Sequence, residues 1–252
     1  MQRNPQRPGS PGQFTALLAF SAIFLACTAL CACRSPTVPR CTPLAPGKVQ
    51  ASVWLSVDAT LPDQAEKTVE LALHDAGIAV GFGLQLVGHK RANLPIPFAV
   101  GQDALAQMSP AQARVALTQP LAQLVSQMAE QPAAALQVAL LPDLAPPQGA
   151  ASFILTELQG IGLPRVVTAQ ADAPWMISLP PRNSPLILLS WAQWQRLGQP
   201  ARAQLLVHEM GHALGLQHDA RPGNAMAPPE PQAGLWLDPG QLQTVVQAVC
   251  AP

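Results

Sequence analysis

Three of the five histidines of this chain fall within one short segment, His208 to His218, which reads HEMGHALGLQH. His208 and His212 are four residues apart, so on a helix they project from the same face, one turn apart. Gly215 can adopt the positive φ that most residues avoid, which ends the helix and lets His218 return toward the first two histidines. The spacing therefore predicts that three imidazoles converge on one metal ion.

The chemistry of such a site follows from its donor set. Three protein nitrogens around a tetrahedral Zn²⁺ leave the fourth position open for water, which is typical of catalytic rather than structural zinc. Zinc lowers the pKa of that water, and the neighbouring Glu209 can take its proton as hydroxide attacks a polarised carbonyl. The remaining histidines, His74 and His89, have no such companions and are expected to be ordinary polar residues. We expect Zn²⁺ as the cofactor, His208, His212 and His218 as its ligands, and Glu209 as the general base.

These residues resemble the motif of the metzincin metalloproteases. A second element supports the resemblance: Asn224-Ala225-Met226-Ala227-Pro228 follows the third histidine, and in that family a methionine in a tight turn lies under the metal. Met226 fits this Met-turn. The Met-x-Pro order is most similar to the matrixin branch, although Ala227 stands where matrixins usually carry Tyr. Asp219 after the third histidine is similar to the reprolysin pattern, so the subfamily stays open.

The resemblance implies both a fold and an activity. The implied fold is an α+β, metzincin-like catalytic domain in which a twisted mixed sheet packs on long helices and the active-site helix carries the HExxH residues. The implied activity is that of a zinc-dependent endopeptidase, in which Glu209 later returns its proton to the leaving amine. We therefore expect a peptide or protein substrate.

In two alternative interpretations, the protein binds zinc but does not hydrolyse peptides. The first is a catalytically silent zinc-binding envelope lipoprotein that acts as a binding module, and the intact Glu209 argues against it. The second is a metal-storage or metal-carrying lipoprotein, which is disfavoured because the chain lacks further His or Cys tracts.

The N-terminus carries a second strong signal. Arg3 and Arg7 precede an apolar run, Phe14 to Leu30, as in a secretory signal peptide. The next residues, Leu30-Cys31-Ala32-Cys33, resemble a bacterial lipobox, which implies cleavage before Cys33 and its lipidation. An ordinary cleaved signal and a retained anchor are the alternatives. The anchor is disfavoured because the run is at the short limit for crossing a bilayer.

These signals divide the chain into a lipoprotein-type signal peptide (1–32), a tether (33–48) and one catalytic domain (49–252). We expect the protein at the cell envelope, held to a membrane by its N-terminal lipid, or secreted. The residue after Cys33 is Arg34, and not the Asp that is found there in other sorting signals. This is compatible with sorting of the protein to an outer membrane.

Composition limits the partners of the mature chain. Removing Arg3 and Arg7 leaves 12 of the 14 basic residues against 14 acidic ones, so the net charge is about −2. Nothing in that charge attracts nucleic acid. Only 11% of residues are charged and 28 are prolines, which favours long extended connections, while 49% apolar content argues against disorder. We expect a monomer.

Two cysteines remain free once the signal peptide, with Cys27 and Cys31, is removed and Cys33 is acylated. A disulfide between Cys41 and Cys250 is the simplest expectation in an exported, oxidising compartment, and it would tie the two ends of the domain together. Pro39-Arg40-Cys41 also resembles the start of the matrixin cysteine switch, in which a thiolate occupies the open zinc position. Thr42-Pro43-Leu44 departs from that pattern, and both roles of Cys41 stay open.

Hydrophobic periodicity and turn residues predict the remaining elements. Gly77 is expected to end the first helix, and Gly160-Ile161-Gly162 to form a turn. Trp191 and Trp194 are expected in the core. Strands are predicted at 49–57, 82–87, 136–141, 151–158 and 186–189, and helices at 64–75, 190–197, 202–214 and 239–249.

Residues 104–130 have no assigned role. Pro110 and Pro120 interrupt a run of helix formers, which predicts two short helices. A surface insertion is preferred over a flap that gates the substrate.

Overall fold

The computed structural model describes residues 40–45, 48–97, 107–144, 160–165, 179, 181–227 and 235–251, which all belong to one compact unit, Val38–Pro252. The predicted signal peptide, the lipidation site Cys33 and the strand predicted at 151–158 lie outside these residues. Within them, no helix combines the length and apolar character that crossing a membrane requires.

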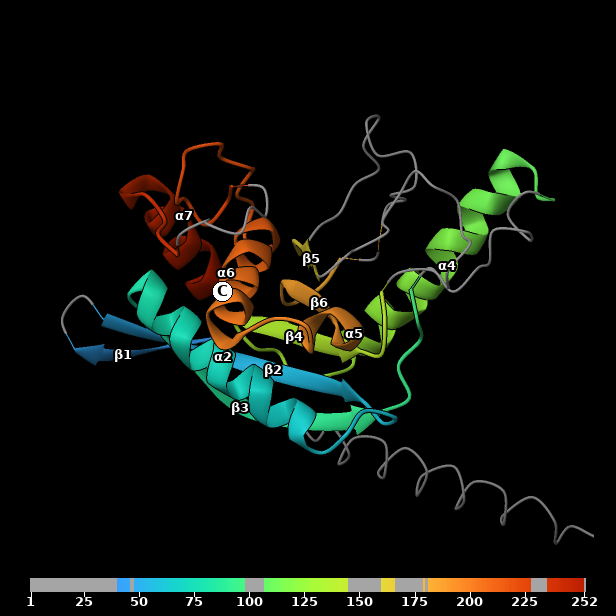
Figure 1. Ribbon diagram of the computed structural model, residues 1–252, viewed down its shortest axis with the longest axis horizontal. Coiled ribbons are helices and arrows are strands. Elements are labelled where there is room, and N and C mark those ends of the chain that lie inside the picture. The colour runs from blue at the N-terminus through green and yellow to red at the C-terminus, as the bar shows by residue number, and fades with distance from the viewer. Residues whose placement is uncertain are drawn as a thin grey trace, which may run out of the picture. The chain divides into compact units, whose positions relative to one another are not determined.

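The described elements alternate between strands and helices from β2 to β4, and the chain ends with three helices (Figure 1). In chain order they are β1 (Cys41–Ala45), β2 (Lys48–Asp58), α2 (Gln64–Val80), β3 (Gly83–Ala92), α4 (Pro110–Ala129), β4 (Leu136–Leu141), β5 (Gly160–Leu163), β6 (Leu186–Ser190), α5 (Trp191–Trp194), α6 (Gln199–Ala213) and α7 (Pro239–Cys250).

The strands form one mixed sheet in the order β1-β2-β4-β6-β5, with β3 pairing with β2 outside this path. β2 is parallel to β3 and β4, and β4 is parallel to β6, whereas β1 and β5 are antiparallel to their neighbours. Figure 1 shows α2 and α6 lying side by side in front of the sheet. The predicted α+β fold is confirmed, with the HExxH residues on α6.

β4 has a core on both of its faces, so every one of its residues is buried. Val138 and Leu140 belong to the larger core, which includes Val69 of α2 and Val207 of α6. Leu141, on the opposite face, belongs to a second core with residues of α4 and β6. Side chains alternate between the faces of a strand, so one buried strand can serve two cores.

The first helix is longer than predicted, because Gly77 lies inside α2 and does not end it. A Cβ on Gly77 would lie 2.9 Å from the carbonyl oxygen of Phe82 and 3.1 Å from the Leu84 nitrogen. The glycine therefore allows the helix to lie close to the next strand. The helix ends instead at Gly81, which has a φ of 77° and caps it in the left-handed conformation.

The prediction of two short helices in 104–130 was wrong, since α4 is a single helix. Pro110 lies in its first turn, after a capping box between Ser109 and Gln112, and Pro120 lies inside it. An internal proline costs about 3 kcal/mol. Four buried side chains beyond it, which pack against the sheet in the second core, outweigh that cost. They are Leu121, Leu124, Val125 and Met128. This half of α4 is a core element rather than a surface insertion.

The sheet reaches into the segment expected to be a tether, because β1 pairs with β2 and places Cys41 opposite Ala51. Pro43 lies in this strand, and proline is tolerated in a strand at an edge of a sheet. The Cys41 sulfur is bonded to that of Cys250 at the end of α7. In this structure Cys41 therefore has no free thiol to offer as a switch.

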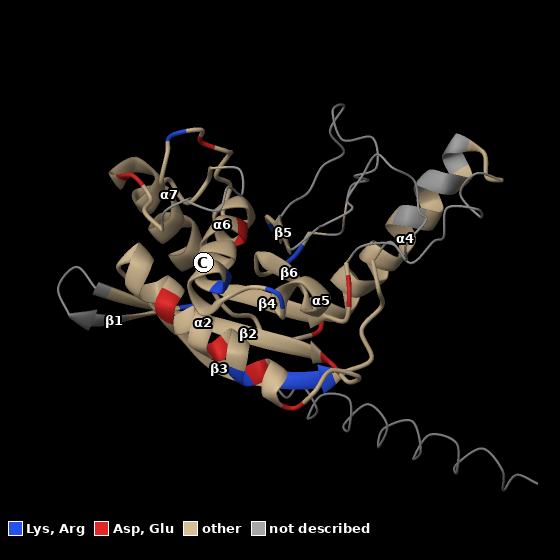
Figure 2. Cartoon of the chain, in the orientation of Figure 1, with Lys and Arg blue, Asp and Glu red and all other residues tan. Residues whose placement is uncertain are grey.

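Charged side chains gather along α2 and the neighbouring β3 (Figure 2). Arg91 Nε donates to Glu66 Oε1 at 2.7 Å, which joins β3 to the first turn of α2. His89 lies 3.3 Å from the other oxygen of Glu66, and His74 lies 3.3 Å from the carboxylate of Asp75. Both histidines are ordinary polar residues, as expected.

Candidate metal centre

The end of α6 brings the third histidine back to the first two. Gly215, just after the helix, has a φ of 93°, as its position in the motif predicts. The Leu216 N–H donates to the Gly211 carbonyl at 2.8 Å across this turn, in the manner of a Schellman motif. The chain thus reverses and places His218 beside His212, with ring centroids 4.6 Å apart.

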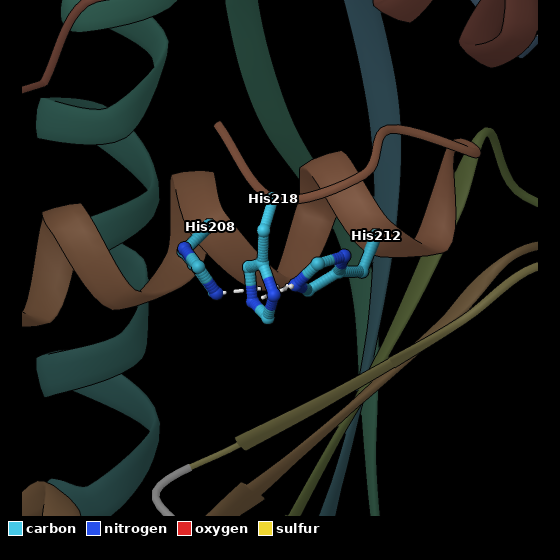
Figure 3. Close-up of side chains that lie close together, drawn as sticks. All are labelled: His208, His212 and His218. Carbon is cyan, nitrogen blue, oxygen red and sulfur yellow. Dashed lines mark hydrogen bonds between the residues drawn. The ribbon is translucent and has the colours of Figure 1, made fainter. Parts of the chain in front are cut away.

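The three imidazoles converge through their Nε2 atoms (Figure 3). Nε2 of His212 lies 3.1 Å from Nε2 of His208 and 3.1 Å from Nε2 of His218. His208 and His212 are half-buried, whereas His218 is exposed. The structure thus brings together the three side chains that the sequence predicts as ligands.

Two backbone carbonyls determine which ring nitrogens face the common point. Nδ1 of His208 lies 2.8 Å from the carbonyl oxygen of Ala225, and Nδ1 of His212 lies 3.0 Å from that of Leu216. A carbonyl can only accept, so each Nδ1 carries the proton and each Nε2 of the neutral ring presents a lone pair. The contact of 3.1 Å between these two Nε2 atoms therefore brings two acceptors together and cannot be a hydrogen bond.

A cation at the common point would remove that repulsion. Around tetrahedral zinc, with Zn–N distances of about 2.0–2.1 Å, ligand nitrogens lie about 3.3 Å apart. The Nε2 separations of 3.1 Å are close to that value. Carbonyls that accept from Nδ1 are also the usual means of orienting histidine ligands. The three residues thus fit one zinc ion.

Burial keeps two of the rings neutral. Desolvation lowers the pKa of His212 to about 4, although its hydrogen bond to Leu216 opposes the change. Desolvation also lowers the pKa of His208. At neutral pH both imidazoles are therefore uncharged, which is the state that binds a metal.

Glu209 lies on α6 beside the histidines and is buried, with 7% of its surface exposed. Burial raises the pKa of its carboxyl group to about 7, and a hydrogen bond from the Gly162 N–H in β5 partly offsets this. A carboxyl group that titrates near neutrality can both take up and return a proton at physiological pH. Its environment suits the predicted general base.

The segment Gly160-Ile161-Gly162 is part of β5, so its prediction as a turn was wrong. A Cβ on Gly160 would lie 2.7 Å from Cγ of Glu209, and one on Gly162 would lie 2.0 Å from the Glu209 carbonyl oxygen. The two glycines let β5 lie directly against α6. Glycine in a strand often marks such a close approach, which was the available signal.

Met226 is fully buried in a turn beneath α6. Its sulfur is so close to the helix that a Cβ on Gly211 would lie 2.2 Å from it. Asn224, also fully buried, accepts a hydrogen bond from the Met226 N–H at 2.8 Å through its side-chain oxygen. Ala225, between them, provides the carbonyl that holds His208. The turn therefore supports both the helix and one imidazole.

A charged network after the third histidine was missed by the sequence reasoning. The Arg221 guanidinium contacts the carboxylates of both Asp219 and Asp238. Its hydrogen bonds are the main reason that the pKa of Asp219 is lowered to about 2, and they also lower the pKa of Asp238. The only signal in the sequence was an acidic residue, Asp219, and a basic residue, Arg221, two positions apart directly after the motif.

Similarity to known proteins is found only with solved structures. No protein-family model matches the sequence, and no curated protein matches it. Similar solved structures include archaemetzincin from Methanopyrus kandleri, at 17% identity and a TM-score of 0.45, over 79% of this chain and 94% of that one. Another is a zinc-dependent peptidase from Methanocorpusculum labreanum, at 14% identity and a TM-score of 0.40, over 77% and 99%. Both similarities are weak in sequence and in structure.

Proposed function

We propose that this protein is a zinc-dependent endopeptidase of the metzincin type. One observation carries the proposal: Nε2 atoms of three histidines converge as lone-pair donors beside a buried carboxyl group. The histidines account for the metal, and Glu209 accounts for proton transfer. A silent binding module would have no need for a buried carboxyl group on the helix that carries two of the three histidines.

The residues of the chain divide the reaction between them. Zinc, when bound, polarises a peptide carbonyl and acidifies a water molecule. His208, His212 and His218 hold the ion, and two of these rings are fixed through Nδ1. The Glu209 carboxylate takes the proton from the attacking water and delivers it to the nitrogen of the leaving amine. The Gly162 N–H holds that carboxylate toward β5.

The sheet offers support for an extended peptide as the substrate. β5 is the last strand in the sheet order, and among the described strands it pairs only with β6. An edge strand next to a catalytic group can bind an extended chain through backbone hydrogen bonds. A peptide bound along β5 would pass close to Glu209, which packs on Gly160 and Gly162.

The test compares wild-type protein with Glu209→Gln, both loaded with zinc, on an unbiased peptide library. Glu130→Gln, at the exposed end of α4, is the matched control. We expect cleavage by the wild type and the control, no cleavage by Glu209→Gln, and one zinc ion in all three. Equal activity in Glu209→Gln would exclude this mechanism. No cleavage by any zinc-loaded form would favour a binding module.

We also propose that the mature protein is anchored at the cell envelope by a lipid on Cys33. The support is the sequence Leu30-Cys31-Ala32-Cys33 after an apolar run. Labelling with a fatty-acid analogue in a bacterial host should mark the wild type and leave Cys33→Ser unlabelled. Equal labelling of the two forms would exclude Cys33 as the site.

A further inference from the structure

The third histidine of the cluster is held differently from the other two. Nδ1 of His208 and Nδ1 of His212 each face a backbone carbonyl. The His218 ring lies beside those of His208 and His212, but within the described part of the chain its Nδ1 has no carbonyl partner. His218 is also the exposed member of the cluster. Its orientation therefore depends on how the backbone around it is held.

The next residue, Asp219, is fixed on two sides. Its N–H donates to the Met226 carbonyl at 2.9 Å, which joins it to the turn beneath α6. Its carboxylate accepts from the Arg221 N–H at 3.0 Å and from Arg221 Nε at 2.9 Å. Gln241 Nε2 donates to the same carboxylate at 3.3 Å. The backbone that carries His218 is therefore tied to the amino end of α7.

Arg221 connects Asp219 to that end of α7. Its guanidinium also contacts Asp238, the N-cap residue of the helix. Gln241 closes the network, because its Oε1 accepts from the buried Asn224 Nδ2 at 2.8 Å. The loop after the third histidine, the turn beneath α6 and the start of α7 are thus joined through side chains.

We propose that Arg221 is a positioning residue: by clamping Asp219 to Asp238 it preorganises His218 and so sets the affinity of the site for zinc. This inference rests on the proposed function, since it takes His218 to be a zinc ligand. A ligand without its own orienting hydrogen bond must lose more freedom on binding unless its backbone is already held. Removing outer contacts of this kind typically weakens metal binding by about 10–100-fold.

The test measures zinc affinity of the full chain in detergent by competition with a chromophoric chelator. Arg221→Met is compared with Arg91→Met, a matched control that breaks a similar ion pair between β3 and α2. We expect zinc binding to weaken by about tenfold or more in Arg221→Met. Arg91→Met should bind zinc as the wild type does. Arg221 is exposed, and ion pairs of exposed side chains contribute little to stability, so zinc-free Arg221→Met should melt near the wild-type temperature.

A second variant guards against a folding defect in Arg221→Met. Asp238→Asn keeps the side-chain oxygen that caps α7 by accepting from the Gln241 N–H, but it removes the charge that faces Arg221. It should also weaken zinc binding, and the absorption bands of bound Co²⁺ should change in both variants. Zinc affinities equal to that of Arg91→Met in both would overturn the proposal. A wild type that binds no zinc would overturn the proposed function as well.

Discussion

The sulfur of Met226 occupies the space in which a side chain on Gly211 would lie. Gly211 is inside α6, where alanine is favoured over glycine by roughly 1 kcal/mol. The close contact with Met226, and not helix propensity, therefore explains why this residue is glycine. The contact places the turn under the residues between the first two histidines of the cluster.

A double-mutant cycle should detect this contact. Gly211→Ala is expected to lower the free energy of unfolding by about 1–3 kcal/mol through overpacking. Met226→Ala should lower it by about 2–5 kcal/mol through an unfilled cavity. In the double variant the new methyl group enters the space left by the methionine, so the loss should be smaller than the sum. Urea unfolding of the four proteins measures the difference, and additivity within about 0.5 kcal/mol would contradict the contact.

The close approach of β5 to α6 should make Gly162 intolerant of a side chain. In Gly162→Ala the new Cβ would lie 2.0 Å from the Glu209 carbonyl oxygen and 2.8 Å from Cβ of His212. We expect loss of both stability and zinc binding, because strand and helix must separate. Gly198→Ala is the control, since a Cβ there would meet only Pro200 at 4.0 Å. Thermal unfolding and zinc titration compare the two variants, and a Gly162→Ala protein that matches the control would refute the packing.

The buried carboxyl group should make stability depend on pH in a way that Glu209→Gln removes. Its pKa in the folded protein is about 7, above the ordinary value of 4.5. Between these values the folded state keeps a proton that the unfolded state has released, so the free energy of unfolding falls as pH rises. The effect amounts to roughly 3 kcal/mol. The lowered pKa values of His208 and His212 act in the opposite direction, but equally in both proteins.

The measurement is urea unfolding of the zinc-free wild type and Glu209→Gln, below pH 4.5 and above pH 7. Glu209→Gln should gain stability relative to the wild type as pH rises. Glu130→Gln should show no such gain, because its side chain is exposed. A stability difference that stays constant with pH would show that Glu209 is not desolvated.

Reducing the Cys41–Cys250 disulfide should destabilise the protein without abolishing its zinc site. The bond closes a loop with a sequence separation of 209 residues. Its removal is expected to cost about 2–5 kcal/mol. The double variant Cys41→Ser/Cys250→Ser should melt at a lower temperature than the wild type and match the reduced protein. Unchanged stability together with higher peptidase activity in Cys41→Ser would favour the cysteine switch instead.

Some errors of sequence reasoning share one physical cause. Glycine and proline have local preferences that predict turns and helix ends, and at Gly77, Gly160 and Pro120 these preferences were misleading. At the two glycines the missing side chain makes room for a neighbouring element. At Pro120 the burial of the next two turns outweighs the broken helical hydrogen bond. In each case the deciding neighbour is remote in sequence.

The sequence by itself determined the elements that depend on nearby residues. The spacing of His208 and His212 and the left-handed Gly215 are local features, and each is found where it was predicted. Only the tertiary structure decided what surrounds them. Gly162 packs against Glu209, and Met226 lies under Gly211. Arg221 contacts the carboxylates of both Asp219 and Asp238. Helical periodicity places side chains within a turn of each other, whereas contacts between elements depend on how the sheet and helices pack.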